Sequence, residues 1–285
     1  MNPFRYAKNF FSDDYLAQQL TWAFGLFLLS LVVVMAGVVL IRRAVGKPRR
    51  SSTGTLPPPG LAAFERYEIG ARLWHVGLVG ILLALWISGA AFYIPGIVPG
   101  PVPVLGMSWL WVHLAFGLMF MLGLVVHVIK APLAGGRTML FDRLDWHQLV
   151  AGARYYLGLP HELPKLGKYG VWNKVFHVAL ILLALIMIVS GIILSLDTLG
   201  WAVIDQNWHR QQRLLHDLGS YGFLALVAAH VFWQLLKRRP QLKAMITGTI
   251  AADTFGSNHD WDRWKPHVVS QTAKAGKVDH GEKTD

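Results

Sequence analysis

Histidines are the residues of this sequence best suited to chemistry. Six of the twelve lie within, or in the first turn of, apolar runs long enough to cross a bilayer: His75, His113, His127, His177, His216 and His230. An ionisable side chain at membrane depth is costly, so it usually faces a bundle interior and has a function. The chain contains no cysteine. This excludes thiolate-held iron–sulfur clusters, covalently attached haem and disulfides, so metal chemistry would depend on other ligands.

His216 and His230 are 14 residues apart on one predicted helix. At 100° and 1.5 Å per residue, they return to within about 40° of the same face and lie roughly 21 Å apart along the axis. One helix face therefore presents two imidazoles at two depths. A haem iron with two axial histidines takes one imidazole from each of two facing helices, so the pattern predicts two non-covalent haems b.

Partners for these two histidines are available at both depths. His113 lies near the outer boundary of its run, as His216 does, and the two can share an outer haem. At the inner depth, both His75 and His127 match His230, and spacing alone leaves that choice open.

The histidines and two of the glycines in the apolar runs each have a structural and a functional interpretation. A single intramembrane histidine is often satisfied by an interhelical hydrogen bond, whereas four at matched depths on three helices favour two haems. His177, at the start of the fourth run, is interpreted as structural or quinone-adjacent. Gly117 and Gly219 would let a porphyrin approach the backbone, although small residues also serve close helix packing.

Five apolar runs must position these histidines, and they cover about 21–41, 73–95, 107–129, 175–196 and 214–236. Hydrophobic residues make up 54% of the chain and charged residues 15%, whereas about a quarter of a soluble domain is charged. We expect an all-α integral membrane fold, with a four-helix transmembrane di-haem bundle and one extra N-terminal transmembrane helix. The first run exceeds a signal-peptide core and lacks a following cleavage site, so it is interpreted as an uncleaved anchor.

The basic residues predict the orientation of the chain. Segments 42–72, 130–174 and 237–285 hold seven, seven and nine of the 27 Lys and Arg residues. The remaining four are Arg5, Lys8, Arg210 and Arg213. Because Lys and Arg concentrate in cytoplasmic loops, we expect a bacterial inner-membrane protein with its N-terminus outside and its C-terminus in the cytoplasm.

Breaks in composition divide the chain into three predicted parts. Segment 1–60 holds the extra anchor and a cytoplasmic linker that ends in Pro57-Pro58-Pro59-Gly60. Segment 61–240 is the four-helix cytochrome core, and segment 241–285 is a cytoplasmic tail.

An ordered set of short motifs runs from about residue 64 to about residue 266. The motifs are Arg72-Leu73-Trp74-His75 with Ser88-Gly89, His113-Leu114-Ala115-Phe116-Gly117, Lys168-Tyr169 with Lys174 and Ser190-Gly191, the pair His216 and His230, Ile246-Thr247-Gly248, and Trp264-Lys265-Pro266-His267. Together they resemble the gamma subunit, a di-haem cytochrome b, of respiratory membrane-bound formate dehydrogenase.

The resemblance implies a ligand set and a set of partners. It implies that His113 and His216 hold the outer haem and that His75 and His230 hold the inner one, which leaves His127 as the alternative inner ligand. It further implies an iron–sulfur beta subunit and a molybdenum or tungsten alpha subunit on the outer face, with electrons passing inward to quinone. The chain would then be a non-catalytic electron-transfer subunit.

The entry to the fourth run keeps the family pattern only in part. The family reads Lys-Tyr-Asn-x-Gly-Gln-Lys there, with the Asn and Gly close to the quinone. Here Gly170, Trp172 and Asn173 replace the Asn, Gly and Gln. A quinone needs a hydrogen-bond donor and an apolar slot, which Asn173 and Trp172 could supply, although Trp172 could equally be an interface anchor.

Two other functions compete with this interpretation. The chain could be the cytochrome b subunit of a hydrogenase or thiosulfate reductase, because the related membrane cytochromes of those enzymes also bind haem through histidines on transmembrane helices. It could also be a haem-free transporter or scaffold, although the sequence shows no inverted repeat.

Overall fold

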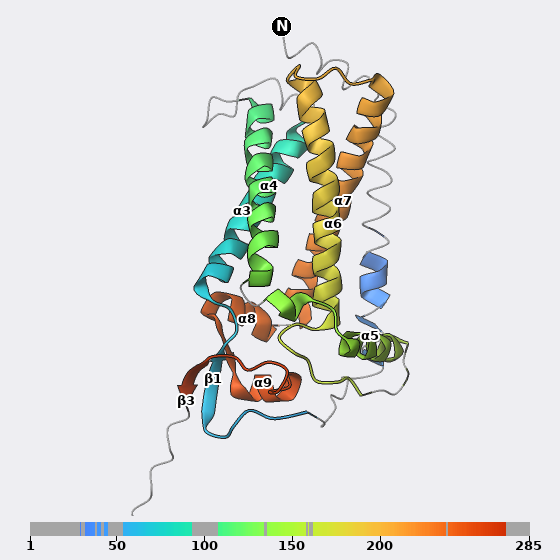
Figure 1. The fold of residues 1–285 in the computed structure, drawn as a ribbon. Helices are drawn as coiled ribbons and strands as arrows, with labels where there is room; N and C mark the ends of the chain where they lie inside the picture. The colour runs from blue at the N-terminus through green and yellow to red at the C-terminus, as the bar shows by residue number, and fades with distance from the viewer. Residues whose placement is uncertain are drawn as a thin grey trace, which may run out of the picture.

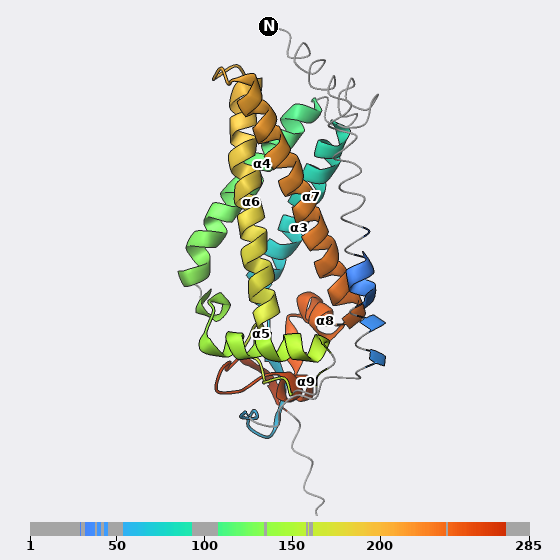
Figure 2. The same ribbon diagram turned by 90° about the vertical axis from the view of Figure 1, so that its right-hand side faces the viewer.

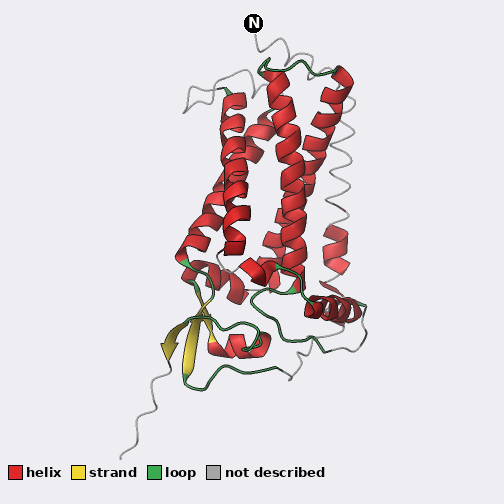
Figure 3. Cartoon of the chain, viewed as in Figure 1, coloured by secondary structure: helices red, strands yellow, loops and turns green. Residues whose placement is uncertain are grey.

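The computed structural model describes residues 54–92, 108–133, 136–157, 159, 162–237 and 239–271, with scattered residues between 29 and 44. Most of the predicted first span, residues 93–107 and the chain beyond residue 271 lie outside these residues. Within the described chain, the architecture is mainly helical (Figure 3).

Four long helices form a bundle (Figure 1). They are α3 (Ile69–Ala91), α4 (Trp109–Leu133), α6 (Val171–Thr198) and α7 (Gln206–Lys237). Each contains a stretch that is long and apolar enough to cross a membrane. The 23 residues of α3 extend about 35 Å at 1.5 Å per residue, which exceeds the roughly 30 Å of bilayer hydrocarbon. The chain is therefore a multi-pass membrane protein.

The helices pack as two consecutive antiparallel pairs. α3 packs mainly on α4 and α6 mainly on α7, while α4 also contacts α6. Between the pairs lies an apolar layer of buried residues, Leu82, Leu85, Phe120, Ala184 and Phe223. The rings of Phe120 and Phe223 meet edge to face with centroids 6.0 Å apart. This central layer ties all four helices together, because it takes residues from each.

Local capping contacts, and not the limits of the apolar runs, determine where some of these helices begin and end. α7 begins at Gln206, eight residues before the predicted apolar run, because the Asp205 carboxylate accepts the Asn207 N–H at 2.9 Å and so satisfies a free donor of the first turn. Gly200 follows the end of α6 with φ +71°, a left-handed conformation that favours glycine.

A small unit closes the end of the bundle at which α3 and α6 begin, called here the sheet end. It comprises β1 (Leu61–Glu65), the 3₁₀ turn Gly136–Met139, α5 (Arg143–Tyr156), α8 (Arg239–Thr247), β2 (Thr249–Ala251), α9 (Ala252–Asn258) and β3 (Val268–Gln271). The strands form an antiparallel sheet in the order β2-β1-β3. α5 lies across the sheet end instead of along the bundle (Figure 2). The all-α prediction omitted this sheet, because strands of three to five residues are too short to show a period-2 pattern.

A buried arginine joins the sheet to the loop before α6. The guanidinium of Arg66, 2% exposed, donates to Nε2 of His259 at 3.1 Å and to the Lys168 carbonyl at 3.3 Å. It also lies over the Trp264 ring, 5.3 Å from its centroid. Strand β1 and the α6 entry are therefore fixed to one another.

Candidate functional site

The two predicted outer histidines face each other across the bundle. The rings of His113 on α4 and His216 on α7 have centroids 6.2 Å apart and planes inclined by 71°. Two imidazole nitrogens that each lie about 2 Å from one metal are about 4 Å apart, which places the ring centroids about 6 Å apart. The observed pair therefore fits the two axial ligands of one haem iron.

Each outer histidine contacts a serine hydroxyl through Nδ1. Ser88 Oγ lies 2.9 Å from Nδ1 of His113, and Ser190 Oγ lies 3.1 Å from Nδ1 of His216. Nδ1 of His216 also lies 3.0 Å from the Met187 carbonyl oxygen. Both rings are therefore engaged through Nδ1.

The glycines of the bundle differ in which atoms lie next to the space that a side chain would occupy. A Cβ added to Gly89 would lie 3.4 Å from Cε1 of His113, and one added to Gly191 would lie 3.1 Å from Cε1 of His216. Of the glycines predicted to admit a porphyrin, Gly117 has no described atom within 4 Å of the added Cβ. Gly219 instead packs against α6, with Met187 Cγ at 3.1 Å, so helix packing explains it.

The structure brings together two other histidines at the level near the sheet end. Nε2 of His127 on α4 lies 3.5 Å from Nε2 of His177 on α6, and Trp74 stacks parallel to the His127 ring. The sequence did not predict this contact of His177, because spacing within one helix does not reveal which helices are neighbours.

The other two candidate ligands at this level have different surroundings. His75 is exposed on the second turn of α3. The His230 ring on α7 stacks on Phe176 with centroids 4.8 Å apart. The contact between His127 and His177 directs Nε2 of His127 towards α6.

The predicted quinone residues lie where α5 meets the start of α6. Gly170 is the N-cap of α6, and the next residue, Val171, donates its N–H to Gln148 Oε1 on α5 at 3.1 Å. Trp172 packs on α5, because a Cβ added to Gly152 would lie 3.2 Å from its indole nitrogen. Asn173 follows in the first turn, with its backbone N–H bonded to the Gly170 carbonyl.

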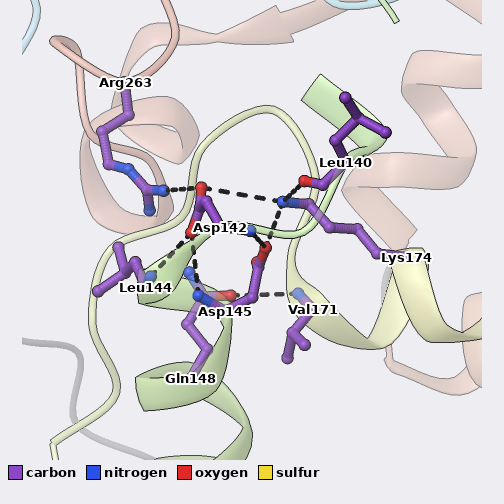
Figure 4. Close-up of polar contacts among 8 residues, drawn as sticks. All are labelled: Leu140, Asp142, Leu144, Asp145, Gln148, Val171, Lys174 and Arg263. Carbon is purple, nitrogen blue, oxygen red and sulfur yellow. Dashed lines mark hydrogen bonds and ion pairs between the residues drawn. The ribbon is translucent and has the colours of Figure 1, made fainter. Parts of the chain in front are cut away.

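A buried ion pair joins α5 to α6 (Figure 4). Lys174 Nζ lies 2.6 Å from the Asp145 carboxylate and donates to the Leu140 carbonyl at 2.8 Å. Asp142 caps α5 and pairs with Arg263 at 2.6 Å. Burial alone would raise the pKa of Asp142, but the N–H groups and these cations outweigh it and hold the pKa below its ordinary value.

The loop before α6 also perturbs two titratable groups. Burial lowers the pKa of Lys168, and burial raises the pKa of Tyr169 to about 12. Tyr169 therefore stays neutral across the physiological range and can act as a hydrogen-bond donor at the sheet end.

Comparison with known families agrees with this geometry. A sequence model described as prokaryotic cytochrome b561 matches residues 66–248, which cover the four helices, all six intramembrane histidines and both serines. A search among curated proteins finds no match. Membership makes the chain a haem b-binding membrane cytochrome with a role in electron transfer, and it disfavours a haem-free transporter or scaffold. The span of the match and the facing histidines lead to one conclusion: the chain belongs to the prokaryotic cytochrome b561 family.

Proposed function

We propose that this chain is the membrane-anchoring cytochrome b subunit of a quinone-linked formate dehydrogenase. It would carry electrons through two haems b from an outer module, made of a molybdenum or tungsten subunit and an iron–sulfur subunit, to the quinone pool. The observation that carries the proposal is the pair His113 and His216, whose rings are 6.2 Å apart. The ordered motifs from residue 64 to 266 support the formate dehydrogenase assignment.

The proposed ligands are His113 and His216 for the outer haem, and His75 and His230 for the inner haem. When bound, haem b supplies reversible one-electron transfer. His75 is preferred to His127 as the inner ligand, because the resemblance to the formate dehydrogenase gamma subunit implies His75; Nε2 of His127 lies 3.5 Å from Nε2 of His177. His75 and His230 both lie about two turns from the sheet end of their helices and so share a level.

The proposed quinone site lies at the α6 entry, with Gly170, Trp172 and Asn173. The exposed fraction of Trp172 is 47%, so its ring reaches the surface of the bundle beside α5. The Asn173 carboxamide makes no hydrogen bond to the rest of the described chain, which leaves a donor for a quinone carbonyl.

A cytochrome b subunit of another oxidoreductase, such as a hydrogenase or a thiosulfate reductase, is the second candidate. Two observations favour it. The matching family model is not specific to formate dehydrogenases, and the quinone motif departs from the formate dehydrogenase pattern at Gly170, Trp172 and Asn173.

The proposal is tested with the complex purified from its native membrane in mild detergent. We expect two haems b per chain by pyridine haemochrome, co-purification of an iron–sulfur subunit, and haem reduction by added formate. Reduction by hydrogen instead of formate would support the second candidate. A reduced-minus-oxidised spectrum without a b-type band would refute both.

A further inference from the structure

The two helix pairs of the bundle repeat one pattern of residues. In α3 and α6, a histidine precedes a Ser-Gly pair by 13 residues, as His75 with Ser88-Gly89 and His177 with Ser190-Gly191. In α4 and α7, two histidines are 14 residues apart with a phenylalanine midway. Because α3 and α6 both begin at the sheet end, the two halves repeat in parallel and are not inverted.

The repeated serines are buried and occupy equivalent positions beside the outer histidines. Ser88 is 0% exposed and Ser190 is 1% exposed. Each Oγ lies 2.6 Å from the carbonyl oxygen four residues earlier, which is Ala84 for Ser88 and Ile186 for Ser190. A hydroxyl has one proton, and each serine donates it to this carbonyl oxygen. The oxygen can then only accept a hydrogen bond from the imidazole.

This arrangement sets the tautomer of each outer histidine. Nδ1 of His113 must carry the proton that it donates to Ser88 Oγ. For His216 the Met187 carbonyl, which can only accept, imposes the same choice at 3.0 Å. With Nδ1 protonated, the lone pair is on Nε2, and Nε2 is the free nitrogen of each ring.

The glycine after each serine fixes the position of the ring. With no side chain at Gly89 or Gly191, the Cε1 edge of each imidazole rests against the helix backbone. A methyl group at Gly191 would lie 3.1 Å from His216 Cε1, which is closer than ordinary van der Waals contact. Serine and glycine together therefore hold each ring in one orientation.

We infer that Ser88 and Ser190 are positioning residues that hold His113 and His216 as Nδ1-protonated ligands and tune the outer haem. The inference rests on the proposed haem ligation. A hydrogen bond accepted from Nδ1–H makes the imidazole a stronger electron donor to its metal. Stronger donation favours the ferric state, so the two hydroxyls lower the reduction potential of the outer haem.

The test uses the full chain in detergent, with Ser88→Ala, Ser190→Ala and the double variant. We expect two haems per chain by pyridine haemochrome, a higher midpoint potential for the outer haem and an altered low-spin ferric EPR signal. The inner-haem potential should stay unchanged. Ser88→Thr and Ser190→Thr, which keep the hydroxyl, should restore the wild-type potential and EPR signal.

Ser195→Ala is the matched control, because Ser195 makes the same type of bond, to the Gly191 carbonyl at 2.5 Å, on the same helix. Its potentials should equal those of the wild type. Loss of the outer haem alone in an alanine variant, rescued by threonine, would also support the inference. Unchanged potentials and EPR in the double variant, or equal shifts in Ser195→Ala, would overturn it. A wild-type chain without haem would refute the proposed function instead.

Discussion

At the scale of single residues, the candidate ligands differ in how firmly the protein holds them. His113 and His216 are each fixed through Nδ1 by a buried serine. His75, by contrast, is exposed on the second turn of α3. The proposed outer site is therefore preorganised by the fold, which would lower the entropic cost of haem binding there.

Single alanine variants test the ligand set. His113→Ala or His216→Ala should lose the outer haem, and His75→Ala or His230→Ala the inner one, because an iron with one remaining axial histidine is held more weakly. Haem per chain should fall from two to one in each variant, by pyridine haemochrome. Retention of two haems in His75→Ala would show that the inner pairing is wrong.

His127→Ala is expected to keep both haems. The Nε2 atom of His127 is directed at His177, at 3.5 Å, so the change removes an interhelical hydrogen bond and no ligand. Such bonds contribute on the order of 1 kcal/mol in membranes, so a small drop in thermal stability should accompany an unchanged haem count. Loss of one haem here would move the inner ligand to His127.

Lys174 provides a prediction about stability. Lys174→Met leaves the Asp145 carboxylate, 3% exposed, without its cation, and breaking a buried pair in this way costs about 3–5 kcal/mol. The free energy of unfolding in detergent should fall by that order. Lys265→Met is the control, because its 3.9 Å pair with Asp262 is mostly exposed and should cost less than about 1 kcal/mol.

The same network predicts a pH dependence. The folded pKa of Asp142 is held below its ordinary value of 3.8, so its contribution to stability is present above that value. The contribution is lost as pH falls through the lower folded pKa. Limited proteolysis of the α5 segment should therefore stay constant from pH 7 to 5 and increase only in stronger acid; an increase between pH 6 and 5 would contradict this account.

At the scale of elements, the junction of α5 with α6 is the proposed exit for electrons. Asn173→Ala removes an amide donor from the first turn of α6, so reoxidation of the haems by a quinone analogue should slow while both haems stay bound. Stopped-flow absorbance measures the rate. Asn207→Ala, at the other end of the bundle on α7, is the matched control. Equal rates in wild type and Asn173→Ala would place the acceptor elsewhere.

The elements also show which features sequence alone could predict. The four bundle helices follow from hydropathy, since a bilayer demands about 20 apolar residues per span, and their ends differ where a cap such as Asp205 extends a helix. The position of His113 opposite His216 could be predicted, because both histidines lie near the outer boundary of their apolar runs. The short strands and the contact between His127 and His177 could not, because they depend on which distant segments become neighbours.

At the scale of the whole molecule, the orientation in the membrane is the main prediction. The sheet end carries the loops rich in Lys and Arg, which should be cytoplasmic. A reporter that is active only in the cytoplasm should work when fused after Asp285 and fail when fused before Met1. The reverse pattern would exchange the outer and inner haems.

The 14-residue spacing of His216 and His230 has an electrical consequence. The roughly 21 Å between these two levels is about two-thirds of the roughly 30 Å hydrocarbon core. A charge that crosses the whole membrane does about 2.3 kcal/mol of work per 100 mV, so an electron moving between the two levels does about 1.6 kcal/mol. If the proposed haems lie at these two levels, electron transfer between them would be a voltage-sensitive step, whose equilibrium would shift more than tenfold for each 100 mV.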